Sequence, residues 1–143
     1  MYTSQPPKIS LIREHIRSIA PIVSERGWKI VIALHPLDEA SSYDDLLSGV
    51  VHRVAADSYD LLRDCAVHVS VSSTLMWEAM IFDKSTYALD YGNHEVDLLT
   101  DFVDFGFGRP LAMGEFPEPF PLPTQPRREY FFSPEIDYKT FDS

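Results

Sequence analysis

Short apolar runs alternate with amphipathic segments over the first 109 residues of the chain. The apolar runs, which predict buried strands, cover residues 28–34, 50–54, 67–71 and 85–89. Residues 8–26 repeat apolar side chains at helical spacing, and further helices are predicted over 43–48, 58–65, 75–82 and 97–105. Continuous apolar strands that alternate with helices predict a parallel sheet covered on both faces.

The first part of the chain adds two details. Pro21 is expected to kink the first predicted helix or to split it in two, and Gly27 is a plausible stop. Residues 2–4 (Tyr-Thr-Ser) resemble the end of an additional first strand. We therefore expect the chain to be a piece of a longer protein. With right-handed crossovers, the order of elements predicts an α/β domain over 1–109 with a Rossmann-like, doubly wound parallel sheet.

Residues 110–143 have a different composition. They hold seven of the eleven prolines and also seven aromatic residues. The prolines predict an irregular, extended segment, and the aromatic side chains argue against a free linker. We expect this tail to pack on the domain or on the surface of a partner.

The chain carries a formal charge of −10, which excludes some partners. No basic stripe is available to displace counterions from nucleic acid, and an anionic membrane surface is disfavoured for the same reason. No apolar run approaches the roughly 20 residues of a membrane span. Cys65 is the only cysteine, which excludes an internal disulfide and a cysteine-based metal cluster. A single cysteine is compatible with a reducing cytoplasm. We expect the side chain of Cys65 to pack against other apolar residues.

Candidate chemistry lies where the predicted strands end, because doubly wound sheets bind ligands beyond the carboxyl ends of their strands. Three polar segments take these positions: Ser4-Gln5, residues 35–39, and the turn Ser72-Ser73-Thr74. The turn opens a helix, where hydroxyls, free N–H groups and the helix dipole together favour a phosphate or pyrophosphate.

Glu78 lies one helical turn further on, where its carboxylate could accept hydrogen bonds from the two hydroxyls of a ribose. The alternative is that the serines and threonine only cap the helix, and that Glu78 only complements its dipole.

His35 precedes Pro36 at the end of a strand, where it could bond a phosphate or a sugar hydroxyl, or have a purely structural role. Asp38 and Glu39 follow it, but their spacing in a loop does not indicate a metal site, and we expect neither a metal nor a cofactor. The sequence contains no nucleophile elbow and no Walker loop.

Taken together, these segments resemble a known family. The strand ending in His-Pro, two valine-rich strands and the sequence Ser-Ser-Thr followed by Glu78 are similar to the C-terminal, nucleotide-sugar-binding domain of GT-B-fold proteins. The groups it resembles are bacterial surface-polysaccharide glycosyltransferases and the UDP-N-acetylglucosamine 2-epimerase superfamily. The resemblance covers residues 2–111.

The resemblance implies a role for each matching residue. The turn Ser72-Ser73-Thr74 would hold the diphosphate of the donor, and Glu78 would bind the ribose. His35 would line the donor cleft, residues 54–56 would contact the base, and Ser4 and Gln5 match a polar turn near the diphosphate. The epimerases have Ser-Gly-Gly where this chain has Ser-Ser-Thr, which favours a transferase.

The expected function is therefore that of a donor-binding domain, whose partner is a nucleoside-diphosphate sugar. Such enzymes have two Rossmann-like halves, and the N-terminal half would be missing from this chain, which alone should bind nucleotide weakly and turn over nothing. Two alternatives remain open: a 2-epimerase-like domain, and a non-catalytic α/β interaction module. A homo-oligomer is also possible.

Overall fold

The structure is a computed structural model, and it describes residues 1–5, 8–54, 57–71, 75–89, 103 and 106–122. Along the chain its elements are β1 (Tyr2–Thr3), α1 (Ile9–Glu25), β2 (Ile30–Ala33), the 3-10 helix η2 (Ala40–Leu46), β3 (Val51–Val54), α2 (Ser58–Asp64), β4 (Val67–Ser70), α3 (Leu75–Ile81), β5 (Ser85–Leu89) and β6 (Gly108–Leu111). The helix expected over 97–105 lies outside the described residues, except for residue 103.

The strands form one parallel sheet in the order β3-β2-β1-β4-β5-β6. This is the strand order of the Rossmann fold, and it confirms the predicted α/β class. The chain builds outward from β1 to β3, returns through α2 to β4 on the other side of β1, and then builds outward again. The order therefore reverses between β1 and β4, which places the ligand crevice of this fold type between their carboxyl ends.

Helix α1 covers one face of the sheet with an apolar stripe. Ile12, Ile16, Ile19 and Val23 recur at helical spacing, are at most 3% exposed, and pack with the buried side chains of the central strands. Pro21 was expected to kink this helix or to split it in two; α1 runs unbroken through Pro21, so the helix is not split. Because proline has no N–H, Pro21 leaves the carbonyl group of Arg17 without its helical donor. Both residues are exposed, so water can donate to that carbonyl group instead.

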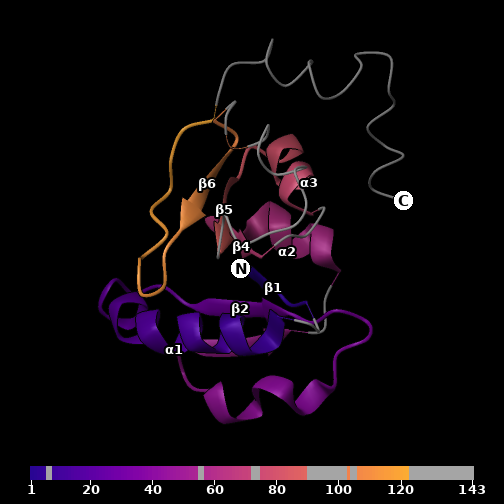
Figure 1. Cartoon of the computed structure of the whole chain (residues 1–143), viewed down its shortest axis with the longest axis vertical. Coiled ribbons are helices and arrows are strands. Elements are labelled where there is room, and N and C mark those ends of the chain that lie inside the picture. The colour runs from indigo at the N-terminus through magenta and orange to yellow at the C-terminus, as the bar shows by residue number, and fades with distance from the viewer. Residues whose placement is uncertain (6–7, 55–56, 72–74, 90–102, 104–105, 123–143) are drawn as a thin grey trace.

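Helices α2 and α3 supply the second layer. Figure 1 shows them on one side of β4 and β5, while the segment that follows β6 lies on the other side. Their inward side chains, Leu62, Met76, Ala79 and Met80, are completely buried. The sheet is therefore covered on both faces, as the continuous apolar runs predict.

Strand β6 was not predicted from the sequence. It runs from Gly108 to Leu111 beside β5, with Ala88 level with Pro110, and so it crosses the expected domain boundary at residue 109. A proline cannot donate to a ladder and is tolerated at the edge of a sheet, which is where β6 lies.

Residues 112–122, called here the covering segment, continue from β6 across the face of the sheet that α1 also covers. Its backbone is bonded by side chains of β5. Ser85 Oγ accepts from Phe120 N at 2.8 Å and donates to Phe120 O at 2.9 Å, and the Tyr87 hydroxyl donates to Glu118 O at 2.6 Å. Phe120 is 7% exposed and meets the Tyr87 ring edge-on. The described part of the expected tail therefore packs on this domain.

Within the described part of the chain, no helix combines the length and the apolar character that crossing a lipid bilayer requires.

Candidate functional site at the carboxyl ends of the central strands

Gln5 bridges the two strands at which the sheet order reverses. It follows β1, and its side-chain Oε1 accepts hydrogen bonds from Val71 N at 3.1 Å and from Ser70 Oγ at 3.2 Å, both at the end of β4. This amide therefore holds the carboxyl ends of β1 and β4 together, directly before residues 72–74. The contact positions the two sides of the crevice relative to each other.

Ser4 is completely buried, and its polar groups are engaged inside the protein. Its backbone N donates to Ala33 O at 2.9 Å, and its hydroxyl lies 2.7 Å from the hydroxyl of Tyr43. Tyr43 belongs to η2 and is itself fully buried, and this burial raises the pKa of its phenol. The pair fastens η2 beneath the carboxyl ends of β1 and β2.

His35 ends β2 in a loop that is closed by its own hydrogen bonds. The backbone N of His35 donates to Asp38 Oδ2 at 2.8 Å, and Leu37 N donates to His35 Nδ1 at 3.0 Å. Because Nδ1 accepts, the neutral ring carries its proton on Nε2. The side chain of His35 is exposed, so that Nε2–H can donate to a ligand. Asp38 Oδ1 is buried, and no described residue donates to it.

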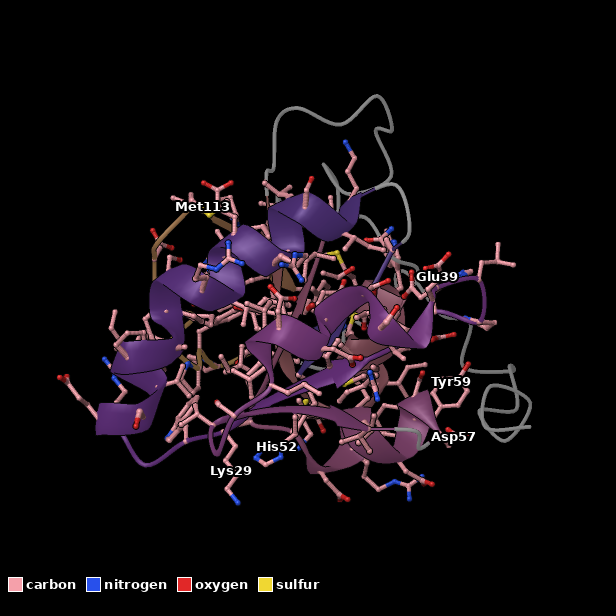
Figure 2. All side chains as sticks on the ribbon, turned by 90° about the horizontal axis from the view of Figure 1, so that it is seen from below. Lys29, Glu39, His52, Asp57, Tyr59 and Met113 are labelled. Atoms are coloured by element: carbon pink, nitrogen blue, oxygen red, sulfur yellow. The ribbon has the colours of Figure 1, made fainter. Side chains whose placement is uncertain are left out.

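Glu78 is held at the start of α2, although it belongs to the first turn of α3. The Tyr59 hydroxyl donates to Glu78 Oε1 at 2.9 Å, and Asp57 caps α2 by accepting from Tyr59 N at 2.8 Å. Partial burial raises the pKa of Glu78, and the hydrogen bond from Tyr59 opposes that rise. Figure 2 shows Asp57 and Tyr59 on the same side of the molecule as Glu39, which follows β2.

The sequence-predicted site residues are distributed around this edge of the sheet. Ser4, Gln5, His35 and Glu78 all lie beyond the carboxyl ends of β1, β2 and β4, and Gln5 contacts β4 directly. The turn Ser72-Ser73-Thr74 and residues 55–56 lie outside the described residues.

The sequence analysis did not identify three hydrogen-bond partners at this edge of the sheet: Asp38, Tyr43 and Tyr59. Tyr43 meets Ser4 across 39 positions of sequence, and Tyr59 meets Glu78 across 19. No local pattern signals these two pairings, because each depends on how two separate elements pack, whereas Asp38 bonds His35 N within one loop, three residues apart. Knowledge of the strand order would have been needed to find them.

His68 is fully buried in the sheet and takes no part in the crevice. Its Nε2 lies 2.7 Å from Thr3 Oγ1, and its Nδ1 lies 2.8 Å from Thr86 Oγ1. Burial lowers the pKa of His68 to about 3, so the ring is neutral at physiological pH. It is a structural cross-link between β1, β4 and β5. No three His, Cys, Asp or Glu side chains of the described residues converge as metal ligands would.

The parallel strand order defines the class of this chain: it is an α/β protein with a Rossmann-like sheet. Its sequence matches no model of a known protein family, and a search of curated proteins likewise finds no match.

Proposed function

We propose that this chain is the donor-binding domain of a GT-B-type glycosyltransferase, of the kind that builds bacterial polysaccharide, and that it holds the nucleoside diphosphate of a nucleotide sugar. One observation carries the proposal. The residues that the family resemblance singles out, as far as they are described, follow β1, β2 and β4 at the carboxyl edge of the sheet, and Gln5 bridges β1 and β4 where the strand order reverses. Sheets of this type bind nucleotides at that point.

The position of Glu78 supports a ribose contact. In the proposal the carboxylate accepts the two ribose hydroxyls, and the hydrogen bond from Tyr59 keeps it oriented toward the β3–α2 connection. The residues matched to the base contact, 54–56, enter that same connection. Ribose and base would therefore be bound by neighbouring parts of the edge, as one nucleoside requires.

The proposed chemistry is stabilisation of the leaving group. As the bond between sugar and diphosphate breaks, negative charge develops on the diphosphate. The hydroxyls of Ser72, Ser73 and Thr74 would donate to it, and His35 Nε2–H could donate to the sugar or to a phosphate oxygen. The acceptor and the other Rossmann-like half would complete the reaction, so the chain alone should bind nucleotide without turnover.

Titration of the full chain with uridine and cytidine diphosphate, followed calorimetrically, tests the proposal. Ser72→Ala should weaken binding by roughly 1–2 kcal/mol, about ten-fold in Kd, because a charge-assisted hydrogen bond is lost. Glu78→Gln should weaken the binding of ribonucleotides more than that of inorganic pyrophosphate. Glu25→Gln is the matched control, since Glu25 is exposed and ends α1 on the opposite side of the sheet.

Two results would decide against the proposal. If the folded chain binds neither nucleotide at millimolar concentration, the non-catalytic interaction module is the better reading. If Glu25→Gln weakens binding as much as Glu78→Gln, the loss is common to both variants and does not report a ribose contact of Glu78.

A further inference from the structure

Residues 35–38 (His-Pro-Leu-Asp), called here the histidine turn, form a closed turn just beyond β2. Asp38 N donates to His35 O at 2.9 Å, and His35 N donates to Asp38 Oδ2 at 2.8 Å. Leu37 N donates to His35 Nδ1 at 3.0 Å, and Pro36 has no N–H. Every backbone N–H of the histidine turn is therefore bonded within it.

One N–H group of the histidine turn remains available to a ligand. Because Nδ1 accepts from Leu37 N, the neutral ring of His35 carries its proton on Nε2. The side chain of His35 is exposed, and no described residue accepts a hydrogen bond from this Nε2–H. In this form Nε2 can donate a hydrogen bond but cannot take up a proton. The turn therefore presents a donor and not a base.

The histidine turn adjoins the crevice at which the strand order reverses. Thr3 of β1 is level with Ala33 of β2. Gln5 and His35 each follow that level by two residues, and Gln5 bonds the carboxyl end of β4. A ligand bound between the ends of β1 and β4 would therefore have the histidine turn beside it.

The carboxylate of Asp38 holds this arrangement at a cost in stability. Its Oδ1 is buried, and no described residue donates to it. A buried acceptor without a donor destabilises a folded protein, and such exceptions call for a cause. Here the other oxygen of the same carboxylate accepts from the backbone of the residue that carries the imidazole.

We propose that Asp38 is a positioning residue, which fixes the imidazole of His35 as a neutral hydrogen-bond donor to an anionic oxygen of the bound ligand. A ring that is already held need not be ordered when the ligand binds, so less binding free energy is lost. A charged oxygen is the acceptor that bonds most strongly to such a donor. That this oxygen belongs to a nucleoside diphosphate rests on the proposed function, whereas the fixed ring does not.

Nuclear magnetic resonance of the isotope-labelled full chain tests the fixed ring without a ligand. We expect a scalar coupling between Leu37 N and His35 Nδ1 across their hydrogen bond, with the ring proton on Nε2. Asp38→Ala should abolish this coupling and speed hydrogen exchange of the His35 amide by roughly ten-fold or more, since its acceptor is lost. Asp38→Asn should retain both, because the amide oxygen of asparagine can also accept from His35 N.

Titration with inorganic pyrophosphate and with uridine diphosphate tests what the ring does. His35→Ala should weaken binding roughly ten-fold. Asp38→Ala should weaken it about two- to ten-fold, the factor that corresponds to ordering one side chain. Replacing both residues by alanine should weaken binding no more than His35→Ala alone, because Asp38 acts through His35.

Glu39→Ala is the matched control for the lost charge. Glu39 is an exposed carboxylate of the same loop, and its side chain makes no cap bond to η2. This variant should bind both ligands as tightly as the native chain. If Asp38→Ala does not fold, the coupling in the native chain and the shift of the His35 Nε2–H resonance on adding pyrophosphate decide.

The inference is overturned if the native chain lacks the coupling, or if Asp38→Ala binds as tightly as Glu39→Ala. It is also overturned if the double variant binds clearly more weakly than His35→Ala. Binding of pyrophosphate through His35 without binding of nucleotide contradicts only the proposed function. Nucleotide binding that Asp38→Ala leaves unchanged contradicts only this inference, and binding of neither ligand contradicts both.

Discussion

One face of the sheet is covered in two different ways. Over one half lies helix α1, whose backbone is satisfied by its own hydrogen bonds and whose contacts are made by apolar side chains. Beside it lies the covering segment, an extended chain apart from one turn, in which Glu115 N donates to Ala112 O. Its backbone groups are bonded instead by Ser85, Tyr87 and His15.

The difference shows where each cover takes its stability from. The helix depends on buried apolar area, which is large and not directional. The covering segment also buries Phe120, but it adds a few directional hydrogen bonds at buried positions, where an unmet donor is costly. The helix should therefore respond to a change in side-chain volume, and the covering segment to the loss of a single hydroxyl. The following predictions test this contrast.

The largest effect is expected from Ile16→Ala. Ile16 lies in the middle of α1 and is completely buried, so its truncation leaves a cavity that should lower the free energy of unfolding by about 2–5 kcal/mol. Urea denaturation followed by circular dichroism measures this change. Glu14→Ala on the exposed face should change the free energy of unfolding by less than about 0.5 kcal/mol, and an equal loss in both variants would contradict the argument.

Ser85→Ala should release the covering segment and leave α1 in place. The substitution removes both bonds to Phe120 and leaves its buried N–H without an acceptor, at a cost of about 1–3 kcal/mol. Hydrogen exchange should show lost protection at the Phe120 amide and retained protection in α1. Ser24→Ala, an exposed hydroxyl on α1, is the control; loss of protection throughout the chain would show that the two covers are not separable.

Acid should destabilise the fold through its buried imidazoles. The unfolded chain protonates His68 below a pH of about 6.5, whereas burial lowers the folded pKa to about 3, so the unfolded state binds more protons between these values. The free energy of unfolding should fall by about 2 kcal/mol through this group between pH 7 and pH 5. The free energies of unfolding of wild type and His68→Gln should approach each other as the pH falls from 7 to 5. Free energies that fall in parallel over this range would contradict the prediction.

The smallest effect is expected at the ion pair between Arg26, at the end of α1, and Glu118 of the covering segment. Both side chains are exposed, so water and salt screen their attraction. Glu118→Gln should leave the melting temperature unchanged within the scatter of replicates. A clear drop that high salt abolishes would show that this pair, and not Ser85, holds the covering segment.

Much of the fold could be predicted from the sequence, because the side chains buried by a helix or a strand recur at the regular spacing of that element. The predicted strands at 67–71 and 85–89 became β4 and β5 within one residue, since Val67, Val69 and Val71 alternate along the first and residues 87–89 (Tyr-Ala-Leu) end the second with a buried apolar run. Strand β6 has the sequence Gly-Arg-Pro-Leu, which contains no such pattern, and it exists because β5 offers an edge beside it. The docking of the covering segment likewise depends on Ser85 and Tyr87, which within the run 85–89 look like ordinary strand residues.

The candidate site was predictable in its location more than in its contacts. Strand ends can be found from patterns, so Gln5, His35 and Glu78 were placed at the correct edge. Which side chains hold them in place depends on packing between distant elements, as the bond from Tyr59 to Glu78 shows. A single serine at position 4 likewise does not show whether its hydroxyl is exposed to a ligand or, as in the structure, buried against the hydroxyl of Tyr43.

The shortest strand couples helix α1 to the centre of the sheet. Tyr2 and Thr3 of β1 point to opposite faces, where the Tyr2 hydroxyl bonds His15 of α1 at 2.6 Å and Thr3 bonds His68 at 2.7 Å. Removing α1 would therefore strip a buried partner from a central strand of the sheet, and disrupting the sheet at His68 would weaken the strand to which α1 is bonded. Melting should accordingly be cooperative, with probes placed on α1 and on α3 reporting one shared midpoint.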